Sequence, residues 1–87
     1  MKTFMDLIFR DLEDEGQQAK MRFPNNGRGI SVIKSPYSYG YPDNWEVAIL
    51  KGEDGEIDYD SGITDDVIGN VTDEGVTEIM KQIQELN

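Results

Sequence analysis

The sequence lacks cysteine and histidine, and its 8 Lys and Arg residues are outnumbered by 18 Asp and Glu residues. Without cysteine the chain forms neither a disulfide framework nor a thiolate zinc site. Without histidine it lacks the side chain that most often serves as a general base and as a metal ligand. The formal net charge of −10 also argues against direct binding to nucleic acid, because phosphate contacts require Lys and Arg in excess.

Long hydrophobic runs are missing as well. No apolar stretch approaches the roughly 20 residues of a membrane-spanning helix, and Asp6 and Arg10 interrupt the amino-terminal stretch where a signal peptide would be apolar. We therefore expect a cytoplasmic protein that does not enter a membrane. Its 87 residues, 37% of them hydrophobic, suit a single small domain over residues 1–87 with a thin core.

Apolar residues recur at helical spacing near both ends of the chain. Residues 2–15 predict an amphipathic helix, whose apolar stripe would be formed by Phe4, Leu7, Ile8 and Leu12. Thr72 has the character of a helix N-cap, because acidic residues follow it and acidic side chains are favourable in a first turn. The helix predicted from there to the C-terminus has an apolar stripe formed by Val76, Ile79, Met80, Ile83 and Leu86.

Four segments between these helices have the residue types and the alternation of strands. They cover residues 18–23, 30–34, 45–51 and 56–60. A second short helix or turn is expected after Thr64. Because the connections between strands are short, antiparallel pairing is favoured. The predicted fold class is therefore α+β, an antiparallel sheet of three to four strands with an N-terminal and a C-terminal helix packed on one face.

Every charged residue from Gly52 to Glu78 is acidic. In a strand over residues 56–60, Glu56, Asp58 and Asp60 would point to the same side at intervals of roughly 6.6 Å. Such a row of carboxylates is comparable to a phosphate backbone and can compete for a protein groove that holds DNA or RNA. Charged side chains on an edge strand also prevent aggregation, and this structural role is the alternative explanation of the row.

Tyrosines gather in the loop predicted over residues 35–44, where Tyr37, Tyr39 and Tyr41 precede Trp45. Exposed Tyr and Trp are common in binding surfaces, because they supply large contact areas and are enriched among the residues that dominate binding energy. We expect Trp45 to close the core over the sheet. The three tyrosines either contact a partner or share this structural role.

Patterns for catalysis, metals and cofactors are incomplete. A calcium loop beginning at Asp58 would need Gly in place of Ile63 and Glu in place of Gly69. The short glycine-rich turn at 27–29 lacks the third glycine of a dinucleotide fingerprint, and a serine nucleophile would have no histidine base. We therefore expect no enzyme, no catalytic residue, no metal site and no cofactor. Weak Ca²⁺ or Mg²⁺ binding and a Ser–Lys pair stay open as alternatives.

A resemblance to small proteins encoded by phages and prophages is carried by two stretches, GISVIKSPYSYGYPDNWEVAIL (29–50) and SGITDDVIGNVTDEGVTEIMKQIQEL (61–86). In size, acidity and α+β pattern the chain is also similar to acidic anti-CRISPR proteins and other DNA mimics. The resemblance implies a phage-encoded stoichiometric inhibitor in the cytoplasm of the host bacterial cell. Its partner would be a host nucleic-acid-binding protein or CRISPR effector with a basic groove. This class has no shared sequence motif, so the resemblance assigns no individual residue.

The charge and tyrosine patterns supply the expected partner-binding residues, which are Glu56, Asp58, Asp60, Asp65, Asp66, Tyr37, Tyr39 and Tyr41. The carboxylates would pair with Lys and Arg of the target, and their charge would raise the association rate and make binding salt-dependent. The alternative function is a phage structural or assembly accessory, or a homo-oligomeric module that associates through a sheet edge or the last helix. A regulatory subunit that binds a basic host peptide is a third alternative.

Overall fold

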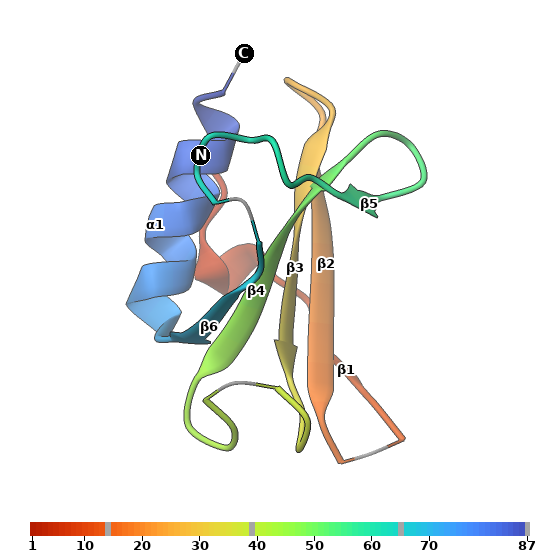
Figure 1. Ribbon diagram of the computed structural model, residues 1–87, viewed down its shortest axis with the longest axis vertical. Helices are drawn as coiled ribbons and strands as arrows, with labels where there is room; N and C mark the ends of the chain where they lie inside the picture. Colours follow the sequence, from red (N-terminus) through yellow and green to blue (C-terminus); the bar gives the residue numbers. More distant parts are fainter. Residues whose placement is uncertain (14, 39, 65, 87) are drawn as a thin grey trace.

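The computed structural model describes residues 1–13, 15–38, 40–64 and 66–86. In these residues the fold is α+β, with an antiparallel six-stranded sheet in the order β1-β2-β3-β4-β5, where β6 also pairs with β4. Figure 1 shows the helix α1 along one side of the sheet and the β4–β5 turn on the other side. The elements are the 3-10 turn η1 (Phe4–Asp6), β1 (Arg10–Asp11), β2 (Gln17–Phe23), β3 (Arg28–Lys34), β4 (Trp45–Lys51), β5 (Glu56–Ile57), β6 (Ile68–Val71) and α1 (Asp73–Gln84).

The α+β class and the antiparallel pairing are confirmed, but the sheet of the described residues has six strands in place of the expected three to four, and the helix predicted over residues 2–15 is wrong. The chain forms the short turn η1 and then runs extended into β1, which pairs with the start of β2. Leu7 is 9% exposed and Ile8 is 88% exposed, so neighbouring side chains point in opposite directions, as they do in a strand. The acidic residues after Arg10 also disfavour a helix there, because anions oppose the negative C-terminal end of the helix macrodipole.

The centre of the sheet is built from two consecutive antiparallel pairs, β2 with β3 and β3 with β4. The β2–β3 ladder runs from Gln17 opposite Lys34 to Phe23 opposite Arg28, which agrees with the antiparallel pairing expected for strands with a short connection. The turn between β2 and β3 is hydrogen-bonded to the end of α1. The Asn26 side-chain amide donates to the carbonyl oxygens of Ile83 (2.8 Å) and Leu86 (3.0 Å). These bonds satisfy carbonyl groups that the last turn of a helix leaves unpaired.

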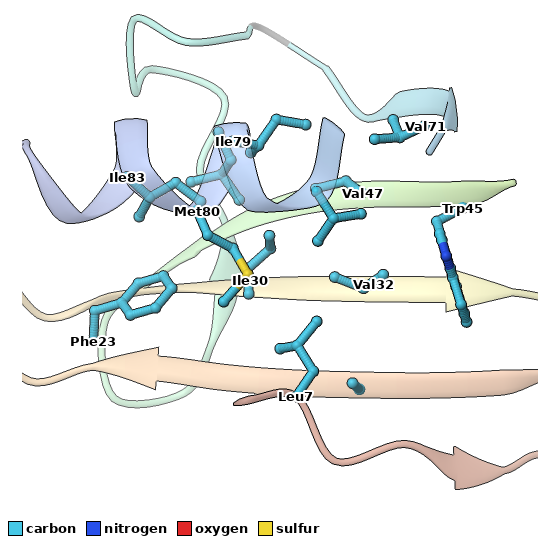
Figure 2. Close-up of a cluster of buried hydrophobic side chains, with 13 residues drawn as sticks. Leu7, Phe23, Ile30, Val32, Trp45, Val47, Val71, Ile79, Met80 and Ile83 are labelled. Atoms are coloured by element: carbon cyan, nitrogen blue, oxygen red, sulfur yellow. The ribbon is translucent and has the colours of Figure 1, made fainter. Parts of the chain in front are cut away.

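The hydrophobic core lies between α1 and the face of the sheet that α1 covers (Figure 2). The helix contributes Val76, Ile79, Met80 and Ile83, which confirms the predicted C-terminal helix and most of its apolar stripe. Thr72 caps it as expected, since its hydroxyl oxygen accepts the backbone N–H of Gly75 at 3.1 Å. Within the described ranges, no helix combines the length and the apolar character that crossing a membrane requires.

The strand predicted over residues 56–60 ends after Ile57. The backbone N–H of Asp58 still donates to the carbonyl oxygen of Ile49 (2.7 Å), but the Asp58 carboxylate oxygen Oδ1 accepts the backbone N–H of Asp60 (2.9 Å). This Asx turn competes with a strand ladder and ends it. The predicted same-side row of Glu56, Asp58 and Asp60 is therefore wrong. The helix or turn expected after Thr64 is replaced by a loop that leads into β6.

Candidate protein-binding surface

The exposed acidic side chains that follow β4 lie along one edge of the sheet. β3 occupies one long edge of β4, so β5 and β6 both pair with the other edge. Figure 1 shows the turn after β4 on the side of the sheet away from α1, and the loop from β5 to β6 passes from there toward α1. We define the acidic edge as the exposed carboxylates of this stretch, which are Glu53, Asp54, Glu56, Asp60 and Asp66.

Internal ion pairs offset little of this negative charge. In the part of the chain that the structure describes, no carboxylate of the acidic edge forms a salt bridge. Lys51 lies directly opposite Glu56 in the β4–β5 ladder and is the nearest cation in the register. On α1, Glu78 and Lys81 approach to 3.7 Å, but both side chains are largely exposed, and exposed pairs of this kind stabilise proteins little. The acidic edge therefore projects a negative field into solvent.

Asp58 differs from the acidic edge because it is 3% exposed. Its Oδ2 forms an ion pair with Nη1 of Arg28 on β3, and its Oδ1 accepts the backbone N–H of Asp60. Both carboxylate oxygens are thus used inside the protein. Asp58, which the sequence assigned to partner contact, instead holds the β5–β6 loop against the sheet.

Short side-chain-to-backbone hydrogen bonds order the rest of the β5–β6 loop. The Ser61 hydroxyl oxygen accepts the backbone N–H of Ile63 (3.1 Å), and the Thr64 hydroxyl oxygen accepts that of Asp66 (3.2 Å). One Asp66 carboxylate oxygen accepts the backbone N–H of Val67 (2.8 Å) while the residue stays exposed. These bonds hold the backbone N–H groups of Asp60 and Asp66, which lowers the entropy lost when these two carboxylates bind a partner. Asp65, also expected to bind a partner, lies outside the described residues.

The tyrosines lie away from the β4–β5 turn and its carboxylates. Tyr37 is 88% exposed and Tyr41 is 39% exposed, in the loop that connects β3 with β4. This loop and the β4–β5 turn are at opposite ends of β4 (Figure 1), which a seven-residue strand separates by roughly 20 Å. The tyrosines are therefore far from the carboxylates of the β4–β5 turn, whereas Asn44 of the same loop donates to Asn70 of β6 (2.8 Å), the strand that follows Asp66. Tyr39 lies outside the described residues.

Trp45 has the structural role that the sequence predicts. It is 5% exposed, its ring stacks on Phe9 with centroids 4.6 Å apart, and its indole N–H donates to the Asp73 carboxylate at 2.8 Å. The Lys34 ammonium lies 4.0 Å from the centroid of the Trp45 ring, a cation–π contact. Trp45 therefore joins the amino-terminal segment, β4 and the start of α1.

Reasoning from sequence missed Arg28 as the partner of Asp58. The available signal was the run Asp58-Tyr59-Asp60 before Gly62, because an Asp that precedes a glycine-containing loop is typical of an Asx turn. Among the described residues, no group of three or more acidic side chains is arranged to hold a metal ion.

Comparisons with known proteins add no assignment to this geometry. No family model, curated protein or solved structure shows detectable similarity to the chain.

Proposed function

We propose that the protein is a non-catalytic, stoichiometric inhibitor, of the anti-CRISPR or DNA-mimic type encoded by phages, that binds a basic surface of its target. The target would be a host defence or DNA-processing protein whose basic groove normally holds nucleic acid. The observation that carries the proposal is the acidic edge. Its carboxylates are exposed and, within the described residues, form no ion pair, whereas Asp58 is paired internally with Arg28.

Electrostatics supports this mode of action in two ways. A net charge of −10, with the exposed carboxylates of the acidic edge outside any ion pair of the described residues, attracts a basic groove over several ångströms and raises the association rate. The ordered β5–β6 loop then presents Asp60 and Asp66 to Lys and Arg side chains without a large loss of backbone freedom. Binding of this kind weakens as added salt screens exposed charges.

The proposal is tested by affinity capture from bacterial lysate at low and high salt, read by mass spectrometry, with three forms of the protein. The wild type is compared with Glu56→Lys/Asp60→Lys on the acidic edge. A matched control, Asp11→Lys/Glu13→Lys, makes the same charge change at exposed sites of the β1–β2 hairpin.

We expect the wild type and the control to retain one nucleic-acid-binding protein at low salt and to release it at high salt. The acidic-edge variant should bind that protein at least about 10-fold more weakly, because the two lysines that replace carboxylates have the same charge as the basic target and repel it. Equal retention by the two variants would refute the assignment of this surface, and capture of the bait alone would refute the function.

A second candidate function, self-association as a structural or assembly module, is favoured by the opposite edge of the sheet. β1 pairs with Gln17 and Gln18, so in the described part of the chain the rest of β2 has no further strand beside it. Ile8, 88% exposed, lines the surface there with Lys20. Sedimentation distinguishes the two candidates. A monomer of 9.9 kDa supports the inhibitor, and a dimer that Ile8→Asp dissociates supports the module.

A further inference from the structure

The face of the sheet opposite α1 carries positive charge, in contrast to the acidic edge. Along β2, Lys20 and Arg22 are exposed and alternate with Ala19 and Phe23, which are buried on the α1 side. Arg10 joins them, because its guanidinium donates to the Gln18 side chain (3.3 Å), which itself donates to Ser31 (3.1 Å). We call this side, formed by alternate residues of β2, β3 and β4, the open face.

A cavity of about 220 Å³ lies on the open face between β2 and the β4–β5 turn. Figure 1 shows this turn on the side of the sheet away from α1. Its walls and floor include Lys20, Arg22, Gly29, Leu50, Glu53 and Asp54. Pockets for drug-sized ligands begin at about 300 Å³, so the occupant of this cavity is a smaller molecule.

The two walls of the cavity carry opposite charges. Lys20 and Arg22 line it from β2, and Glu53 and Asp54 line it from the turn. In the part of the chain that the structure describes, no ion pair joins these two walls, so the charges stay apart. Arg28 also lines the cavity, but its guanidinium is already paired with Asp58.

The backbone fixes the position of the acidic wall. Gly52 and Gly55 have φ values of +73° and +69°, a left-handed conformation that other residues adopt at a cost. The carbonyl oxygen of Gly52 also accepts the N–H of Gly55 (3.4 Å). Between the walls, the half-buried Leu50 side chain and Gly29, which has no side chain, leave an apolar floor. The site therefore combines a cationic wall, an anionic wall and an apolar middle.

We propose that this cavity binds a small zwitterion whose opposite charges stand at the two ends of a short apolar chain, as in an ω-amino acid. The carboxylate of the ligand faces Lys20 and Arg22, and its ammonium faces Glu53 and Asp54. The methylene chain lies on Leu50. A simple anion would be repelled by the acidic wall and a simple cation by the basic wall, so selectivity comes from having both charges.

The test is a titration of the full-length, ¹⁵N-labelled protein followed by NMR, with 6-aminohexanoate as the probe. Hexanoate and hexylamine keep the chain but remove one charge each, and sodium chloride reports the effect of ionic strength. We expect saturable shifts of the amides of Lys20, Arg22 and residues 52–55 with 6-aminohexanoate. Hexanoate and hexylamine should each bind at least about 10-fold more weakly.

Two double variants separate the walls. Lys20→Gln/Arg22→Gln should abolish the advantage of 6-aminohexanoate over hexylamine, and Glu53→Gln/Asp54→Gln should abolish its advantage over hexanoate. Lys51→Gln is the control, since Lys51 adjoins the turn but does not line the cavity. All five side chains are exposed, so the variants keep the fold. The proposal is overturned by non-saturable shifts, by equal binding of hexanoate or hexylamine, or by double variants that bind as the wild type does.

Discussion

The acidic edge and the open face differ in the sign of most of their charges, and they meet at the cavity, where Glu53 and Asp54 line one wall and Lys20 and Arg22 the other. The acidic edge gathers carboxylates, and the open face gathers Arg10, Lys20 and Arg22 from a chain with 8 Lys and Arg residues in all. Within the described residues, no ion pair joins the two surfaces. A surface that serves solubility alone mixes both signs. Charges that are sorted by sign are instead suited to binding charged groups of other molecules. We propose a basic protein for the acidic edge and a small zwitterion for the cavity of the open face.

In the interior, by contrast, opposite charges are paired with each other. Asp58 and Arg28 pair across the sheet, and Asp58 also accepts a backbone N–H, so its carboxylate is satisfied where solvent is absent. Asp58 and Asp60 are two residues apart, yet the first maintains the fold and the second belongs to the acidic edge. Three substitution experiments measure how far these roles are separate.

The largest effect is expected from Asp58→Ala. Removing the carboxylate leaves Arg28, whose side chain is 25% exposed, without its partner and ends the Asx turn of the β5–β6 loop. We expect the free energy of unfolding to fall by about 2–4 kcal/mol, somewhat below the range for a fully buried pair because Arg28 keeps some contact with water. Chemical denaturation followed by Trp45 fluorescence measures it.

Asp60→Ala is the matched control for this prediction. Its side chain is exposed, and its hydrogen bond to Asp58 comes from the backbone N–H, which the substitution keeps. The free energy of unfolding should change by less than about 0.5 kcal/mol. Equal losses for the two variants would mean that buried and exposed carboxylates of this loop do not have separate roles.

Smaller effects are expected from neutralising the two surfaces, and the two effects should be opposite in sign to each other. Glu56→Gln/Asp60→Asn relieves repulsion among like charges and should raise the free energy of unfolding, by up to about 1 kcal/mol at low ionic strength. Lys20→Gln/Arg22→Gln removes cations from a protein of net charge −10 and should lower it by a similar amount. Denaturation at low salt measures both.

The same two variants should converge on the wild type at about 1 M salt, where the Debye length is about 3 Å. If the differences persist at high salt, they arise from packing or hydrogen bonding and not from charge. If both variants stabilise the protein at low salt, the cations of the open face do not offset the acidic residues.

Local patterns were sufficient for the parts of the fold that local interactions decide. The N-cap Thr72 with its following acidic residues predicted α1, and the strand-like alternation of residues 18–23 and 45–51 predicted β2 and β4. The amino-terminal helix failed because Leu7 and Phe9 fit a helical stripe as well as strand-like alternation. Tertiary contacts decide the outcome, since Leu7 enters the core and Phe9 stacks on Trp45 at 4.6 Å.

The candidate surface was predictable as an excess of charge but not residue by residue. The acidic run identified the region that became the acidic edge. It did not reveal that Arg28, 30 residues earlier, would pair with Asp58 and remove it from the surface. The cavity of the open face was equally hidden, because it depends on the β4–β5 turn facing β2 across the sheet, an arrangement of distant segments that alternation within one strand does not specify.

The smallest effect is expected at Lys51 and Glu56. These residues face each other directly in the β4–β5 ladder, and opposite charges in that position attract across the strands. A double-mutant cycle of Lys51→Ala and Glu56→Ala should give a favourable coupling of about 0.2–1 kcal/mol that decreases with added salt. A coupling of zero would mean that Glu56 is as free of internal partners as Asp60 and is equally available to a target. A coupling above this range would place Glu56 with Asp58 among the carboxylates that hold the fold, and the acidic edge would then begin at Asp60.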